Sequence, residues 1–370
     1  MKRLKLQVLR FDEHTITFNS GVNYIVGTNA SGKTTIFNLI QYLLGLRKDI
    51  GFYGSFIKKD EVSLDVLIDN VPFTFKRNLR DKEIIVNNND QQFGIVFGSP
   101  SFSSFLLNLF QPLYNYEVDQ RALVAMLKDS FISEDNDLFS ISAQQKETKL
   151  LSLGINSIYP KRIKTYLKEL ESQMFNQRNT LSGIDSYRKD IQFLLNRELK
   201  ENKDIVDEIL SASLRKYTEE SSQLELVYKD STEFLSKLLD ENEHLLQSKI
   251  NELSPNFSSY LKSIGIENRI SINDLLEGNY KYVSNGEVSL VRLVFEILVQ
   301  SHIASLNRTG LLVNDGRTSY FDHHMSSGFR KFLNQMVSGS DLQYIEFSSN
   351  PLLMEKNEIV FDTTKNLRYV

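Results

Sequence analysis

The chain has 370 residues, of which 41% are hydrophobic and 24% are charged, and its formal net charge is −4. These values are typical of a globular protein with room for two domains, and the negative charge argues against a protein that coats nucleic acid nonspecifically. The sequence has no cysteine, which excludes disulfides and cysteine zinc sites, and no apolar run of membrane-spanning length, so we expect a cytoplasmic protein without a membrane partner.

The first hundred residues carry strand patterns around one helical segment. The strand patterns are alternating or β-rich runs at residues 4–18, 22–26, 62–68, 73–77 and 83–86. The first run predicts a β-hairpin and the others predict single strands, whereas residues 36–46 have apolar side chains at helical spacing. This part therefore predicts antiparallel strands beside a parallel core, and residues 101–150 predict helices and loops.

Between the core strand and the helix lies G-T-N-A-S-G-K-T-T at residues 27–35, which matches the phosphate-binding pattern G-x-x-x-x-G-K-[S/T]. Backbone amides of such a loop face an anionic phosphate, Lys33 would reach the β- and γ-phosphates of ATP, and the Thr34 hydroxyl would ligate Mg²⁺. The predicted nucleotide contacts are Asn29, Ala30, Ser31, Gly32, Lys33, Thr34 and Thr35. The alternative is a glycine turn that precedes a helix by chance.

The middle of the chain has a different composition. From Lys161 to about Leu253 there is no proline and one glycine, Gly183, and apolar residues recur at three- and four-residue steps. This pattern predicts a coiled-coil-like helical hairpin whose tip lies at residues 200–204 or at Gly183. Helices of about 40 residues would reach about 60 Å at about 1.5 Å per residue. A compact helical bundle is the alternative.

Strand patterns are expected to return after Pro255. The expected elements are a turn at 277–279, a strand at 280–283, a helix at 288–303, strands at 310–315 and 343–348, and a closing hairpin at 358–369. The chain is thus divided into three parts: 1–158 as the first half of a nucleotide-binding head, 159–254 as the hairpin arm, and 255–370 as the second half of the head.

These motifs, in this order, resemble the ABC-class ATPases of the SMC, RecF, RecN and SbcC kind. The resemblance rests on residues 9–35, on Ser284-Asn285-Gly286-Glu287, which is similar to their signature motif with Asn285 replacing a glycine, and on residues 311–315, which are similar to their Walker B strand. It implies an α/β P-loop ABC-type ATPase head, split by a helical hairpin, that forms an ATP-dependent homodimer.

The resemblance also implies roles for single residues. Ser284 and Gly286 of one head would meet the nucleotide bound to the other, and Asp315 would hold Mg²⁺ together with Thr34. Arg10 would lie near the phosphates or the base. From the residues alone, Asp315 could instead begin an Asp-Gly turn, and Arg10 could be an ordinary exposed strand charge.

Besides Asn285, two family positions depart from the usual pattern, and a third has more than one candidate. Gly316 stands where a Glu usually orients the attacking water, and such groups are worth about 10²–10⁴ in rate, so slow hydrolysis is expected. Ser348 or Ser349 stands where a His usually covers the γ-phosphate. The glutamine that senses Mg²⁺ is assigned to Gln144, with Gln145 or a substituted loop at 131–134 as alternatives.

Three adjacent polar residues, Asp322, His323 and His324, are further candidates for a functional role. Asp322 would lie in the loop that crosses the dimer or be a solvated side chain. His323 and His324 could suggest a metal site, but adjacent residues converge poorly, so surface histidines are the preferred interpretation.

The departures most resemble the divergent SMC-like ATPases of bacterial mobile-element and anti-phage defence systems, including ABC-three-component systems. The expected function is ATP-dependent head dimerisation that switches an effector protein partner or a DNA-bound complex. One alternative is a non-hydrolysing ATP-dependent scaffold or sensor. Another is a RecF-like DNA-repair factor. The basic arm residues Lys161, Arg162, Lys164 and Lys168 could contact DNA phosphates, but a solvated helix face is their preferred interpretation.

Overall fold

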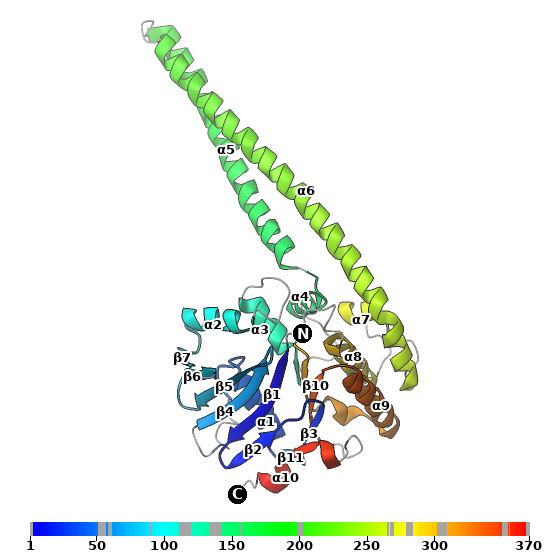
Figure 1. Ribbon diagram of the computed structural model, residues 1–370. Helices are drawn as coiled ribbons and strands as arrows, with labels where there is room; N and C mark the ends of the chain where they lie inside the picture. The colour runs from blue at the N-terminus through cyan, green and yellow to red at the C-terminus, as the bar shows by residue number, and fades with distance from the viewer. Residues whose placement is uncertain are drawn as a thin grey trace. The chain divides into compact units, whose positions relative to one another are not determined.

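The structure is a computed structural model that describes residues 3–50, 57, 61–88, 91–110, 120–133, 143–155, 157–198, 203–264, 266, 270–278, 284–301, 309–349, 354 and 356–367. The chain divides into two units. We call Met1–Ile155 together with Leu246–Val370 the head, and Asn156–Leu245 the arm. Each unit is described by itself (Figure 1).

The head contains an antiparallel sheet with strand order β2-β1-β4-β5-β6-β7. Its strands are β1 (Leu4–Phe11), β2 (His14–Thr17), β4 (Glu61–Ile68), β5 (Val71–Asn78), β6 (Glu83–Asn88) and β7 (Gln91–Val96). The predicted hairpin is confirmed as β1 and β2, and the strands predicted at 62–68, 73–77 and 83–86 are confirmed as β4, β5 and β6. In β4 buried and less buried residues alternate, as the sequence pattern requires. Strand β7 was missed because nearly all of its residues are exposed, which leaves no apolar periodicity to detect.

The second sheet has the order β11-β3-β10-β9-β8, and each pair of neighbours is parallel. Its strands are β3 (Val22–Val26), β8 (Phe131–Ser133), β9 (Leu311–Asp315), β10 (Gln343–Ser348) and β11 (Ile359–Asp362). Every residue of β9 and β10 is buried, because helices cover both faces of this sheet. Strands from before and after the arm therefore build one parallel core, as expected.

Helix α1 (Lys33–Leu43) packs between the two sheets, against β4 and β5 on one side and β9 and β10 on the other. All of its residues from Thr35 to Leu43 are buried, which explains why its apolar pattern extends around the helix. The Phe37 ring makes edge contacts with Phe131 of β8 and Phe347 of β10. Helix α1 is thus fixed against the strands that end at the candidate site.

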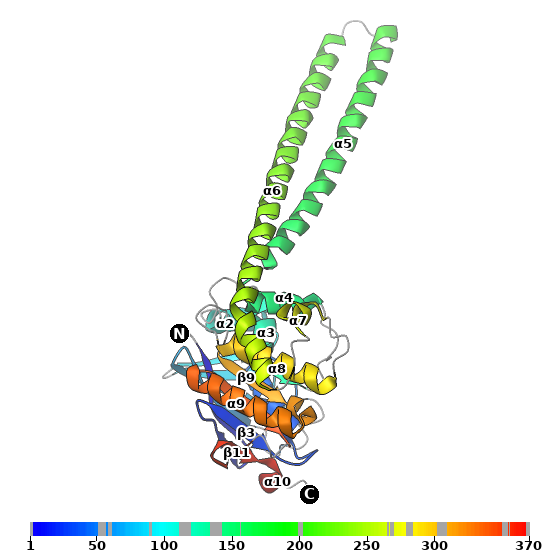
Figure 2. The same ribbon diagram turned by 90° about the vertical axis from the view of Figure 1, so that its right-hand side faces the viewer.

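The opposite face of the parallel sheet is covered by α8 (Asn285–Ser301) and α9 (His323–Gly339), which Figure 2 shows side by side. The end of α6 and α7 (Ile272–Glu277) join the same hydrophobic core. The chain around Ile264, at the end of α6, packs tightly against α9 at Gly328, where an added Cβ would lie 2.9 Å from the Ile264 Cα. The other short elements are α2 (Pro100–Phe110), α3 (Gln120–Lys128), α4 (Ala143–Ser152), the 3-10 helices η3 (Arg317–Tyr320) and η5 (Lys356–Glu358), and α10 (Thr363–Asn366).

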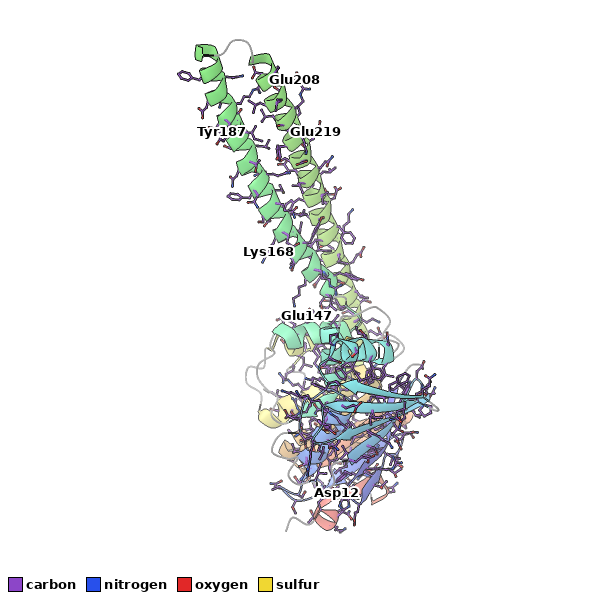
Figure 3. The ribbon with its side chains drawn as sticks, turned by 90° about the vertical axis from the view of Figure 1, so that its left-hand side faces the viewer. Asp12, Glu147, Lys168, Tyr187, Glu208 and Glu219 are labelled. Carbon is purple, nitrogen blue, oxygen red and sulfur yellow. The ribbon has the colours of Figure 1, made fainter. Side chains whose placement is uncertain are left out.

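The arm consists of α5 (Ile158–Glu198) and the first part of α6 (Lys203–Ser263), which pair as an antiparallel hairpin. The Tyr228 hydroxyl donates to Glu171 at 2.6 Å, and Gln192 donates to Asp207 at 3.0 Å. Figure 3 shows Lys168, Tyr187, Glu208 and Glu219 along these helices. The predicted hairpin is confirmed, and the alternative tip at Gly183 is wrong because Gly183 lies inside α5. Of the other predicted tip, residues 200–202 lie outside the described residues, and residues 203 and 204 begin α6.

Four expectations concern the rest of the chain. Strands return after Pro255 as β9, β10 and β11, but they begin later than expected, because Pro255 lies inside α6, which continues to Ser263. The strand expected at 280–283 lies outside the described residues. The closing hairpin is wrong, since β11 pairs in parallel with β3 and leads into α10. Residues 131–133, expected as loop or helix, form the short strand β8.

Helices that could cross a bilayer are not found in the part of the chain that the structure describes, since each is either too short or too polar for that role.

Candidate functional site

The candidate site lies where the parallel strands end. Ser348 of β10 pairs with Val26 of β3, and Asp315 of β9 lies beside Phe347 on one side and Ser133 of β8 on the other. Ligands of open α/β sheets bind at this carboxyl edge. The loop of residues 27–32 leaves β3 at this edge and enters α1, so the motif lies where the topology predicts a ligand.

The loop between β3 and α1 has a backbone conformation that depends on its two glycines. Gly32 precedes α1 in the left-handed region with φ of 93°, where a side chain would be strained. At Gly27 a Cβ would collide with the Thr363 hydroxyl oxygen and with the Ser31 side chain. Ala30 also has a positive φ, 60°, without the freedom of glycine. The surroundings of the loop must therefore hold Ala30 in this conformation.

Lys33 lies at the start of α1, and its side chain folds back over the loop. Its Nζ donates to the carbonyl oxygens of Gly27 and Thr28, both at 2.8 Å. Burial lowers the pKa of the Lys33 ammonium, and the negative charge of Asp315 opposes that change. The fold therefore brings the end of β9 within electrostatic reach of the loop lysine, as the two motifs require.

The other loop residues divide into exposed and inward-facing groups. Asn29 and Ala30 are exposed, Thr34 is half-buried, and Ser31 and Thr35 are buried. The start of α1 has no capping side chain and no acidic residue in its first turn. Its amides and its positive dipole end are therefore suited to an anion such as a phosphate.

The predicted signature residues lie at the start of α8. The Ser284 hydroxyl and backbone N–H both donate to Glu287 at 2.9 Å, and the Glu287 N–H points back to the Ser284 hydroxyl at 3.3 Å. This reciprocal arrangement is a capping box, so both side chains have a structural role. Gly286 is half-buried in the first turn of the helix. Their predicted contact with a second head stays a prediction.

Arg10 lies on β1 of the antiparallel sheet. Its side chain is 48% exposed and forms an ion pair with Asp65 of β4 at 2.7 Å. Thr74 of β5 donates to the other oxygen of Asp65 at 2.8 Å. Arg10 is thus part of a polar network on the sheet, and its predicted nucleotide contact stays a prediction.

Gln144, the predicted Mg²⁺-sensing residue, lies in the first turn of α4, and its side chain and those of Gln145 and Glu134 lie outside the described part. The helix itself is fixed by Lys149, which pairs with Asp129 at 2.6 Å and with Glu296 of α8. The choice among Gln144, Gln145 and the substituted loop at 131–134 as the Mg²⁺-sensing position therefore stays open.

Sequence reasoning missed Glu346, which lies on β10 beside Asn314 and is completely buried. Its carboxyl group accepts hydrogen bonds from Tyr344, Asn314 and Thr318. Burial raises the pKa of Glu346 to about 7, with the charge of Asp315 adding to the increase and the three hydrogen bonds opposing it. Because Thr318 belongs to η3, this carboxyl holds the segment that follows Asp315. The sequence signal for this residue is a single acidic side chain inside a strand whose residues are all buried.

Asp322, His323 and His324 lie at the start of α9. Asp322 accepts a hydrogen bond from the Met325 N–H at 2.8 Å and caps α9, while His323 and His324 are exposed. Among the described residues no group of three His, Cys, Asp or Glu side chains could hold a metal ion. Their exposure places both histidines at the surface.

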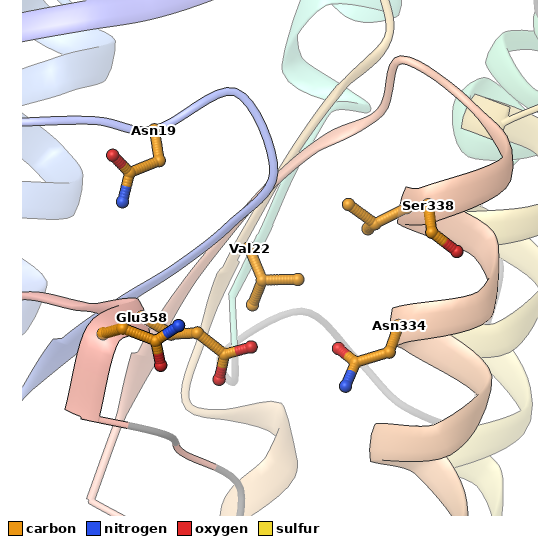
Figure 4. Close-up of a pocket in the computed structure, with 7 residues that line it drawn as sticks. Asn19, Val22, Asn334, Ser338 and Glu358 are labelled. Atoms are coloured by element: carbon orange, nitrogen blue, oxygen red, sulfur yellow. The ribbon is translucent and has the colours of Figure 1, made fainter.

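A cavity of about 390 Å³ lies elsewhere in the head (Figure 4). It is lined by Asn19, Val22, Asn334, Val337, Ser338, Asn357 and Glu358. Val22 begins β3, whereas the phosphate loop follows its end. The cavity therefore lies at the opposite edge of the parallel sheet from the loop.

Comparison with known proteins agrees with this architecture. A model of a family described as AAA domain matches residues 7–264. The chromosome partition protein Smc of Fusobacterium nucleatum is 24% identical over 272 residues, which are 65% of this chain and 21% of that protein. The chain thus spans about a fifth of the length of this curated relative.

A solved structure provides a comparison of the fold. The Smc head domain with an extended coiled coil from Pyrococcus furiosus, crystallised with the C-terminal domain of ScpA, matches with a TM-score of 0.55 and 14% identity. The match covers 96% of this chain and 91% of that one. This likeness establishes the fold, an α/β head split by a helical hairpin.

Proposed function

The chain belongs to the AAA domain family, with an Smc-like head, and from this premise we propose that it binds ATP with Mg²⁺ and uses the nucleotide to join two heads. The observation that carries the proposal is the position of Lys33, which caps the loop carbonyls and is electrostatically coupled to Asp315. In this proposal ATP is a switch that controls assembly.

The residues at the site fit a nucleoside triphosphate and a hard cation. Bound ATP would supply anionic phosphates for the amides at the start of α1 and for the Lys33 ammonium. The Thr34 hydroxyl and the Asp315 carboxylate are oxygen ligands of the kind that Mg²⁺ prefers. Burial of Asp315 strengthens its interaction with a cation, because the local dielectric is low.

Dimerisation is proposed through the start of α8. In the single head a capping box occupies this helix N-terminus, so Ser284 would have to exchange its hydrogen bond to Glu287 for the phosphates of a nucleotide held by another head. Two such contacts, related by twofold symmetry, would make ATP part of the interface. Assembly would then depend on ATP concentration and would reverse when the nucleotide leaves.

We propose that hydrolysis is slow, because Gly316 follows Asp315 where a water-orienting acid is expected. Gly316 has φ of 84°, a conformation that favours glycine over glutamate. This conformation supports a second candidate function, a scaffold or sensor in which ATP holds two heads without being split. The two candidates differ only in whether phosphate is released.

A protein partner is proposed as the target of the switch. The Pyrococcus furiosus Smc head is bound to the C-terminal domain of ScpA, and the Fusobacterium relative is a chromosome partition protein. By analogy, a partner of this kind would read the assembled state of two heads. DNA binding, with a role in repair, defence or mobile-element maintenance, is the alternative output.

The test combines ATP affinity, light scattering and phosphate release, each with and without DNA, for the parent, Lys33→Ala and Lys331→Ala. Lys331 is an exposed lysine of α9 and serves as the matched control. The expected result is an ATP-dependent dimer for the parent and for Lys331→Ala, and a monomer without bound ATP for Lys33→Ala. Equal ATP binding and equal dimerisation in all three proteins would overturn the proposal.

A further inference from the structure

The phosphate loop is contacted by the segment that follows β11. Strand β11 runs parallel to β3, with Phe361 beside Ile25 and Asp362 beside Val26. The chain that leaves β11 therefore runs next to the chain that leaves β3 for the loop. Asp362 stabilises this exit by accepting hydrogen bonds from the N–H groups of Thr364 and Lys365, at 3.1 and 3.2 Å.

Thr363 connects the two ends of the loop. Its side chain is completely buried, and its hydroxyl donates to the Val26 carbonyl oxygen at 2.9 Å. Because that single proton is used, the short contact with Ser31 requires the Ser31 hydroxyl to donate to Thr363. The same oxygen occupies the space that a Cβ would need at residue 27, so the first glycine of the motif is required by this contact.

Thr364 holds the next residue of the loop. Its hydroxyl oxygen accepts the Thr28 N–H at 2.9 Å, while the Thr28 carbonyl accepts from Lys33 at 2.8 Å. The backbone of Thr28 is therefore fixed from both sides. Ala30, two residues later, has the positive φ that needs support from its surroundings. The two threonines hold the chain on either side of Ala30, since Thr364 binds Thr28 and Thr363 binds Ser31.

We propose that Thr363 and Thr364 are positioning residues for nucleotide binding, which keep the phosphate loop in its binding conformation before ATP arrives. The inference rests on the proposed function for its effect on ATP, but the contacts themselves concern the loop alone. Without them the loop would sample other conformations, and binding would be weakened by the fraction of time spent in those conformations.

The test uses Thr363→Val and Thr364→Val, which keep the shape and remove the hydroxyl, and Thr363→Ser and Thr364→Ser, which keep the hydroxyl. Thr309→Val is the matched control, because Thr309 is also a buried threonine with hydroxyl hydrogen bonds but precedes β9 at the other edge of the sheet. ATP affinity is measured by calorimetry with Mg²⁺. Hydrogen exchange of the peptide that contains residues 27–31 is measured without nucleotide.

Each Val variant is expected to bind ATP about fivefold more weakly, which corresponds to about 1 kcal/mol, and to exchange loop amides faster. Each Ser variant is expected to restore both values to within about twofold, and Thr309→Val to change neither. Parent-like exchange and affinity in both Val variants, or no recovery in the Ser variants, would overturn the inference. Faster loop exchange in the Val variants, with no ATP binding by the parent, would instead support the inference and contradict the proposed function.

Discussion

Replacing Glu346 by Gln should remove a pH dependence of stability that the buried carboxyl creates. Glu346 accepts hydrogen bonds from two hydroxyls and one amide. The hydroxyls of Tyr344 and Thr318 can rotate, so a Gln side chain can accept from Asn314 and donate to Thr318 in the same space. The variant should therefore fold, which makes the comparison with the parent informative.

The magnitude follows from the change in pKa. Folding raises the pKa of Glu346 from its ordinary value of 4.5 to about 7. Because the folded state binds the proton more tightly, the stabilisation is complete below pH 4.5 and is lost as the pH rises through about 7. At about 1.4 kcal/mol for each tenfold change in proton affinity, the parent should lose about 3 kcal/mol across this range.

The assay is urea unfolding followed by circular dichroism at several pH values between pH 4.5 and about 7, for the parent, Glu346→Gln and Glu61→Gln. Glu61 is an exposed carboxyl at the start of β4 and serves as the control. The difference in unfolding free energy between Glu346→Gln and the parent should shift in favour of the variant as the pH rises. If that difference stays constant with pH, the argument from burial is refuted.

Two further predictions concern glycines. Gly328→Ala should lower the unfolding free energy by about 1–3 kcal/mol, since its Cβ would lie 2.9 Å from the Ile264 Cα. Gly339→Ala on the same helix is the control, because its Cβ would meet open space. Equal urea midpoints for the two variants would contradict the packing argument. Gly316→Glu should lower the unfolding free energy by about 1–2 kcal/mol, because the backbone at this position has φ of 84°, and Gly316→Asn should lower it less. An unchanged melting temperature in the Glu variant would contradict the strain argument. Faster phosphate release in the Glu variant alone would indicate that the missing acid limits hydrolysis.

The parts of the fold that could be predicted are those with strong local signals. The loop of residues 27–35 could be recognised because its two glycines and its lysine all lie within nine residues. Strands β9 and β10 are apolar runs of the length expected for a buried parallel strand. The arm was predictable because helical periodicity continues over many turns.

The missed elements depend on contacts that are distant in sequence. Strand β8 has three residues and exists because β9 offers it a parallel edge. After β11, the Asp362 side chain caps α10 and turns the chain, where an apolar pattern alone suggested a second strand. Pro255 is accommodated inside α6, although proline usually ends a helix.

At the candidate site, the sequence identified the loop and Asp315 but not their support. Thr363 and Thr364 carry no motif, and their role becomes visible only when β11 lies beside β3. Glu346 belongs to a predicted strand, and its role depends on Asn314 and Thr318, which come from another part of the chain. Ser284 and Glu287 illustrate the opposite difficulty, because one pattern fits both a capping box and a signature motif.

The parallel sheet has a consequence for how the protein is made. Strand β3 pairs with β10 and β11, so its neighbours leave the ribosome about 320 residues after it. At about 5–20 residues per second, β3 waits roughly 15–60 seconds with two unpaired edges. The arm, whose contacts are local, can form during this delay and bring the two halves of the head together. A newly made chain would thus complete the surroundings of its phosphate loop only after β11 has been made, although the loop itself is translated before the arm.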